Sequence, residues 1–144
     1  MTLLEITVVI IIISLITAFA IADYSKRIEL DREKIAVNNL RILDSAFRSY
    51  YIEYGDYSNS GGLQDISYFS NILPIHIIPE GGLTFNCDAG RFMGTPYYNC
   101  RAGPSSGWLL VVYSDTQGTT PGGTPYCNFG PCPSCKDQFT GGCS

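Results

Sequence analysis

Residues 1–22 read MTLLEITVVIIIISLITAFAIA, and this stretch decides the fold. From Ile6 to Ala22 it contains no charged residue. An α-helix rises 1.5 Å per residue, so these roughly 17 residues span about 25 Å, close to the ~30 Å hydrocarbon core of a bilayer. The sequence therefore predicts an apolar helix that needs lipid, or other apolar helices, around it.

One acidic residue, Glu5, interrupts this stretch near its start. A carboxylate in hydrocarbon costs about 2.5–3.5 kcal/mol on insertion scales and usually has a cationic partner. The nearest cation in the sequence is the α-amino group of Met1. At about 4 Å and an effective dielectric constant near 20, their attraction is about 4 kcal/mol. Because a helix cannot easily present its own N-terminus to its own Glu5, we expect the amine of a neighbouring copy to pair with it and set the register of assembly. The alternative is a Glu5 that reaches the lipid headgroups.

The longer stretch MTLLEITVVIIIISLITAFAIADY resembles the mature N-terminus of the type IV pilin and pseudopilin superfamily. Thr2, Leu3, Leu4, Glu5 and Tyr24 match the pattern of that family, and the similarity covers residues 1–55. The resemblance implies a pilin-like fold and a helical homopolymer whose core is formed by the N-terminal helices. The core residues expected from it are Leu3, Leu4, Val8, Val9, Ile12, Leu15 and Phe19.

The resemblance also implies a maturation route. A prepilin peptidase/methyltransferase would remove a short basic leader and methylate the amine of Met1, and assembly machinery would move the subunit from the bacterial inner membrane into a surface filament. Three positions depart from the family: Met1 replaces the usual Phe, Ser14 an often-found Gly, and Ala22 an often-found Pro. Without that Gly and Pro, we expect a straighter and more continuous helix.

Residues 23–54 continue the helix with an amphipathic pattern. Neither Pro nor Gly occurs between Met1 and Tyr54, and Gly55 is placed to end the helix. Apolar residues at three- and four-residue steps predict the face that packs on a head domain: Ala36, Leu40, Leu43, Phe47, Tyr50 and Tyr54. The mixed charges of this half, Glu33 and Asp44 among them, are expected on a solvated or subunit-facing surface.

The remaining chain predicts a small α+β head. Residues 55–82 are expected to connect, with a short helix within 64–72, and residues 83–114 to form an antiparallel sheet with strands at 83–88, 97–102 and 108–114. The run Trp-Leu-Leu-Val-Val-Tyr at 108–113 is the strongest strand signal and is expected at the centre of three or four strands. Residues 115–144 are rich in Gly, Pro and Cys and are expected to be loops held by cross-links.

All six cysteines follow residue 86, which indicates a disulfide framework formed in an oxidising compartment. Cys87 and Cys100 lie on two predicted strands, and we expect them to pair. Cys127, Cys132, Cys135 and Cys143 allow three pairings, and the sequence does not choose among them. Weaker interpretations of this tail are a four-thiolate metal site or a redox pair of Cys132 and Cys135.

The composition favours a structural role. The chain has 144 residues, a formal net charge of −4 and no basic run, which argues against nucleic-acid binding. The lone His76 supports no catalytic set, and the dispersed Asp56, Asp65, Asp88 and Asp115 form no dense calcium loop. We expect no enzymatic activity, metal or cofactor. The expected function is a major pilin-like subunit; the alternatives are a pseudopilin of a secretion or DNA-uptake system, and a monomeric signal-anchored protein with a cystine-rich ligand-binding head.

Overall fold

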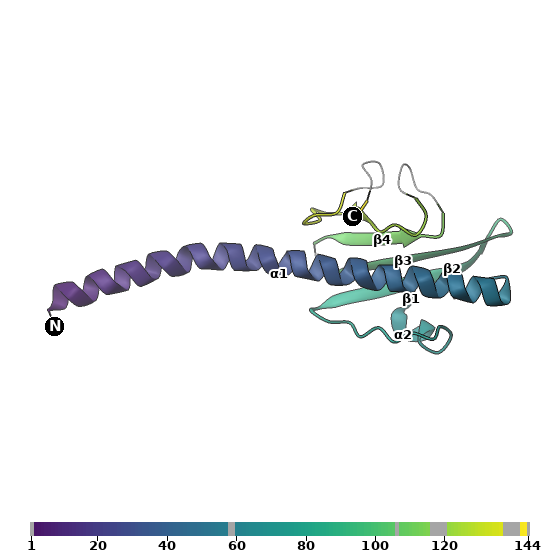
Figure 1. Cartoon of the computed structure of the whole chain (residues 1–144), viewed down its shortest axis with the longest axis horizontal. Helices are drawn as coiled ribbons and strands as arrows, with labels where there is room; N and C mark the ends of the chain where they lie inside the picture. The colour runs from purple at the N-terminus through teal and green to yellow at the C-terminus, as the bar shows by residue number, and fades with distance from the viewer. Residues whose placement is uncertain (1, 58–59, 106, 116–120, 137–141, 144) are drawn as a thin grey trace.

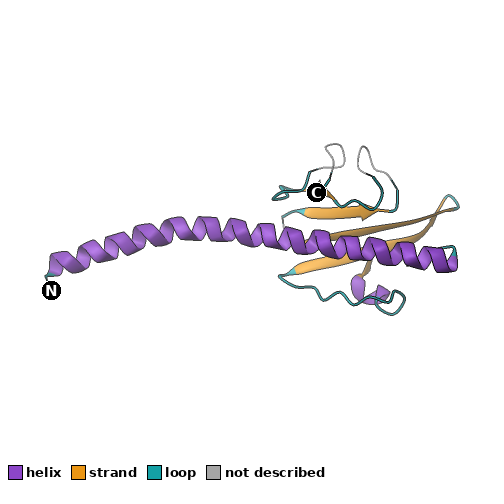
Figure 2. Cartoon of the chain, viewed as in Figure 1, coloured by secondary structure: helices purple, strands orange, loops and turns teal. Residues whose placement is uncertain are grey.

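A computed structural model describes residues 2–57, 60–105, 107–115, 121–136 and 142–143, apart from the side chains of residues 19, 20 and 22. The chain is an α+β structure in which the second half of a long N-terminal helix packs on an antiparallel sheet (Figures 1 and 2). The elements in order are α1 (Leu3–Tyr54), β1 (Gln64–Asp65), α2 (Ile66–Phe69), β2 (Leu83–Phe92), β3 (Thr95–Pro104), β4 (Leu109–Tyr113) and β5 (Tyr126–Phe129).

Helix α1 is continuous over 52 residues, as expected. It ends at Gly55, which adopts a φ of 72° and donates its backbone N–H to the carbonyl of Tyr51 at 2.8 Å. The helix is gently bowed rather than straight (Figure 1). Within the apolar half, the hydroxyls of Ser14 and Thr17 donate to the carbonyls of Ile10 and Ile13, at 2.7 and 2.9 Å. Such contacts often bend helices, which is a local cause for the bow.

The sheet has five strands in the order β1-β2-β3-β4-β5, each antiparallel to its neighbours. The expectation of three or four strands was therefore too low, and the expectation that residues 108–113 form the centre was wrong, because β3 is the central strand. The additional strand β5 comes from the Cys-rich tail, which has too few apolar residues to show an alternating pattern. The short helix predicted within residues 64–72 is reduced to Ile66–Phe69.

The core lies between the second half of α1 and the sheet. Most of the predicted helix stripe is buried there, and the ring of Phe47 stacks on that of Tyr98 with centroids 4.8 Å apart. Tyr54 departs from the prediction, since 62 % of it is exposed at the end of the helix. Apolar burial by α1 is thus what fixes the head to the helix.

Three disulfides cross-link the head. Cys87 and Cys100 face each other on β2 and β3, which confirms the predicted pair. In the tail, Cys127 bonds to Cys132 and Cys135 bonds to Cys143. Both weaker interpretations of the tail fail, because these sulfurs are not thiolates and because Cys132 and Cys135 have different partners.

Candidate functional site

The first half of α1 extends away from the head (Figure 1). The large apolar side chains that are described between Leu3 and Ile21 have between 46 and 82 % of their surface accessible, and the head covers none of the most apolar 18-residue window. This described helix is long and apolar enough to cross a membrane.

The exposed surface is apolar on every side of the helix. Four consecutive isoleucines, residues 10–13, each have more than half of their surface accessible, and consecutive residues point about 100° apart around a helix. The expected core residues Leu3, Leu4, Val8, Val9, Ile12 and Leu15 all lie on this surface. Phe19 belongs to the same helix, but its side chain lies outside the described residues. A helix of this kind requires an apolar environment all round.

Polar groups within this segment are satisfied by the helix itself. The hydroxyl of Thr7 donates to the carbonyl of Leu4 at 2.8 Å, and Ser14 and Thr17 bond to carbonyls one turn earlier. These hydroxyls therefore need no hydrogen-bond acceptor on a neighbouring helix. Among residues 2–22, the one charged side chain is that of Glu5.

Glu5 caps the start of its own helix. Its carboxylate accepts a long hydrogen bond of 3.4 Å from the backbone N–H of Thr2, and its backbone N–H donates to the carbonyl of Thr2 at 3.1 Å. The positive end of the helix dipole stabilises a carboxylate here. Sequence reasoning missed this contact, although Thr-x-x-Glu is a recognised capping pattern. Met1 lies outside the described residues, so its pairing with Glu5 stays a prediction.

The head is tied to α1 by a second charged residue, Glu33, which sequence reasoning placed on the solvated or subunit-facing surface. That placement was wrong, because only 1 % of Glu33 is exposed. Its carboxylate accepts hydrogen bonds from the backbone N–H of Cys135, at 2.9 Å, and from the hydroxyl of Ser134. The signal was available in the sequence: Glu33 lies three residues before Ala36, in step with the apolar stripe.

Further polar contacts join the helix to the head along its length. The indole N–H of Trp108 donates to Glu29 at 3.0 Å, and the guanidinium of Arg41 donates to the carbonyl of Cys143 at 3.3 Å. The hydroxyl of Tyr98 donates to Asp44. These contacts hold the head in one orientation on the helix that carries the apolar segment.

The environment of Tyr98 keeps its phenol protonated. Burial, followed by the hydrogen bond to Asp44, raises the pKa of Tyr98 far above its ordinary range. The same carboxylate accepts from the guanidinium of Arg48 at 3.0 Å, which raises the pKa of Arg48. The Tyr98 hydroxyl is therefore a hydrogen-bond donor at every physiological pH.

The four aspartates considered for calcium do not converge on one site. Asp56 accepts from Arg91 at 2.7 Å, and Asp65 caps α2 by accepting from the N–H of Ser67. Asp88 accepts from the hydroxyls of Ser60 and Tyr97, and Asp115 lies just after the end of β4. Within the described ranges no cluster of three or more His, Cys, Asp or Glu side chains is arranged to hold a metal ion. His76 is exposed in the segment after α2.

Comparison of this chain with protein-family models, with curated proteins and with solved structures finds no match in any of the three. Its architecture is nevertheless compatible with a pilin-like one, because a long N-terminal apolar helix packs by its second half on an antiparallel sheet. The candidate site is the uncovered first half of α1, with Glu5 in its first turn.

Proposed function

We propose that this chain is the subunit of a helical surface filament of the type IV pilus class. The observation that carries the proposal is the apolar half of α1, which the head leaves uncovered on all sides and which contains a carboxylate in its first turn. The head would form the outer shell of the filament. The N-terminal helices would form its core.

Exchange between membrane and filament is energetically accessible to such a helix. Lipid tails are about as apolar as leucine side chains, so each side chain stays buried when lipid is replaced by neighbouring helices. Burying one Leu or Ile fully is worth about 1.5–3 kcal/mol, and many small contributions of this kind hold the helix in either environment. Apolar contacts alone set no axial register, because they are similar at neighbouring positions.

The charged group supplies that register in our proposal. In the single chain, the long hydrogen bond from Thr2 offsets part of the cost of placing the charge of Glu5 in an apolar environment. A methylated amine on Met1 of the adjacent subunit would replace this hydrogen bond with a stronger ionic contact. The partners proposed are therefore further copies of the chain, the inner membrane before assembly, and the processing and assembly machinery of this class. The proposed location is first that membrane and then the extracellular filament.

Substitution of Glu5 tests the proposal. Cells producing the Glu5→Ala variant should insert the subunit in the membrane as the unmodified chain does, and should yield no filaments on shearing and electron microscopy. Glu5→Asp keeps the charge and should retain part of the assembly. Glu53→Ala, at the exposed far end of the same helix, is the matched control and should assemble normally.

The outcome also separates the alternatives. Normal filaments from Glu5→Ala would refute the proposed role of the carboxylate. A signal-anchored monomer would instead be supported if the chain with Glu5 intact stays monomeric in lipid and mass spectrometry detects no methyl group on Met1. Short, scarce filaments tied to a secretion or DNA-uptake system would support a pseudopilin.

A further inference from the structure

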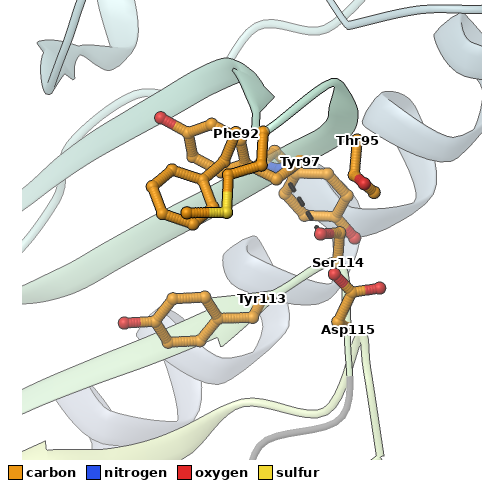
Figure 3. A pocket seen from close by; sticks show the side chains of 8 residues that line it. Phe92, Thr95, Tyr97, Tyr113, Ser114 and Asp115 are labelled. Carbon is orange, nitrogen blue, oxygen red and sulfur yellow. Dashed lines mark hydrogen bonds between the residues drawn. The ribbon is translucent and has the colours of Figure 1, made fainter.

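A cavity of about 530 Å³ lies where the β2–β3 hairpin projects beyond the end of β4 (Figure 3). Strands β2 and β3 pair as far as Phe92 and Thr95, whereas β4 pairs with β3 only from Asn99 to Ala102. The resulting notch is lined by Phe92, Met93, Thr95, Tyr97, Tyr98, Tyr113, Ser114 and Asp115. It is distant along the chain from the apolar helix and has no role in the proposed assembly.

The walls of the cavity are aromatic. The rings of Phe92 and Tyr113 lie on opposite sides of the opening, and Tyr97 lies beside Phe92 (Figure 3). Two of the rings are held in place: Tyr97 donates its hydroxyl to Asp88 at 2.9 Å, and Tyr113 stacks on Tyr126 with centroids 6.0 Å apart. Aromatic faces are electron-rich and attract cations.

The charges around these rings are also negative. Asp115 lies at one end of the cavity, and Asp88 is bound by the hydroxyls of Ser60 and Tyr97, at 3.1 and 2.9 Å. None of the ion pairs formed by the described residues involves either aspartate. The side chains that line the cavity include no Lys, Arg or His.

Two basic residues close to this site are already neutralised, and a third, Arg101 on β3, forms no ion pair among the described residues and does not line the cavity. Arg91 pairs with Asp56 at 2.7 Å, and Arg48, which lies on the helix behind Tyr98, pairs with Asp44 at 3.0 Å. Neither guanidinium is left to balance Asp88 or Asp115. An occupant of the cavity therefore meets electron-rich rings and two carboxylates that form no ion pair with the described residues.

These features select the class of occupant. An anion would be repelled by both carboxylates, and a neutral sugar would leave their charge uncompensated. An extended peptide strand added along the open edge of β3 would meet Pro96, which has no backbone N–H to donate. An organic cation with a quaternary ammonium group satisfies both the rings and the charge, because it is large, weakly hydrated and needs no hydrogen-bond acceptor in a fixed direction.

We propose that the notch between the β2–β3 hairpin and β4 binds a quaternary ammonium group, held by Phe92, Tyr97 and Tyr113 and by the charge of Asp88 and Asp115. The same chemistry occurs in a free solute and in a phosphocholine headgroup. If choline binds and phosphocholine does not, a free solute is favoured, because the carboxylates repel the phosphate of phosphocholine. A headgroup is favoured if both bind.

The test uses the full-length chain in a polyoxyethylene detergent, which carries neither a sugar nor an ammonium group. Choline is titrated and its methyl signals are followed by proton NMR, since aromatic rings above and below the methyls shift them upfield. The matched probe is 3,3-dimethylbutan-1-ol, which has the shape of choline without its charge. We expect choline to bind at least about tenfold more tightly than this alcohol at low salt, and the difference to shrink at high salt.

Substitutions locate the site. Phe92→Leu and Asp115→Asn should each weaken choline binding by about three- to tenfold, and both residues are exposed enough for the fold to tolerate the change. Phe129→Leu, an exposed aromatic of β5 away from the cavity, is the control and should bind choline unchanged. Equal binding of choline and the alcohol, binding of glucose or galactose in preference to choline, an absence of choline binding, or an equal loss in all three variants would each overturn the proposal.

Discussion

Replacing Glu33 by alanine should destabilise the head by about 2–4 kcal/mol and loosen the tail around Cys135. Glu33 is a buried carboxylate on α1, and it accepts hydrogen bonds from two groups of the disulfide-linked tail. The tail also reaches the apolar core, through the buried Cys143 and the partly buried Cys135. The substitution therefore tests how much a charged group adds to that core in holding the tail on the helix.

The magnitude follows from the contacts. Hydrogen bonds to a charged group are worth about 1.5–3 kcal/mol each, so the two bonds contribute about 3–6 kcal/mol. Alanine also removes the unfavourable burial of the carboxylate, which offsets part of this loss. The hydroxyl of Ser134 lies near solvent and can bond to water, whereas the N–H of Cys135 is left without its acceptor. A net loss of about 2–4 kcal/mol is the result.

Urea unfolding of the full-length chain with its disulfides intact measures this loss. Trp108 is the single tryptophan and is buried against the helix, so its fluorescence reports on the head. Glu33→Gln keeps one acceptor oxygen and nearly the same volume, and should cost less than the alanine variant. Asp31→Ala removes an exposed carboxylate whose nearest cation, on Lys34, is 3.9 Å away, and should change stability by less than about 0.5 kcal/mol.

Amide hydrogen exchange adds a local measurement. In Glu33→Ala the amide of Cys135 should exchange faster than in the unmodified chain by more than the change in global stability accounts for, while amides of β3 follow the global change alone. If Glu33→Ala were as stable as Asp31→Ala and the Cys135 amide kept its protection, the assignment of Glu33 as the residue that holds the tail would be refuted.

Two further predictions concern the core and the surface. Phe47→Ala should lower the free energy of unfolding by about 3–5 kcal/mol in the same urea assay, because it removes the ring stacked on Tyr98; Ile52→Ala, which is exposed, should change it by less than about 0.5 kcal/mol. The hydrogen bond from Arg91 lowers the pKa of Asp56 below its ordinary 3.8. The pair therefore stabilises the fold fully above pH 3.8, and this stabilisation is lost as the pH falls through the lowered pKa. An NMR titration of Arg91→Gln should return the pKa of Asp56 towards 3.8, and an unchanged value would show that the guanidinium is not the cause.

Features that depend on neighbouring residues were predictable. The β-rich runs that placed residues 83–88 and 97–102 on strands also made Cys87 and Cys100 expected partners, and the structure pairs them across β2 and β3. The end of α1 at Gly55 was equally visible, because only a residue that accepts a positive φ closes the helix in this way. The candidate site was predictable for the same reason: an apolar stretch interrupted by a single carboxylate is a local property.

Features that depend on residues far apart in the sequence were not predictable. Tyr126–Phe129 is too short and too polar in pattern to indicate a strand, and it becomes β5 only because β4 offers it an edge. The notch with Phe92 and Tyr113 likewise exists because the β2–β3 hairpin extends beyond the end of β4. No single stretch of sequence indicates this difference in length.

The sequence by itself determined one helix, its apolar first half, the position of Glu5, and a cystine-stabilised β head, because helical period, strand period and chain breakers act over a few residues. Only the tertiary structure decided that β3 is central, which tail cysteines pair, and that Glu33 is buried beneath the tail. Those outcomes depend on which surfaces meet after the chain has closed loops of tens of residues, and the free energy of that choice is shared among groups far apart in the sequence.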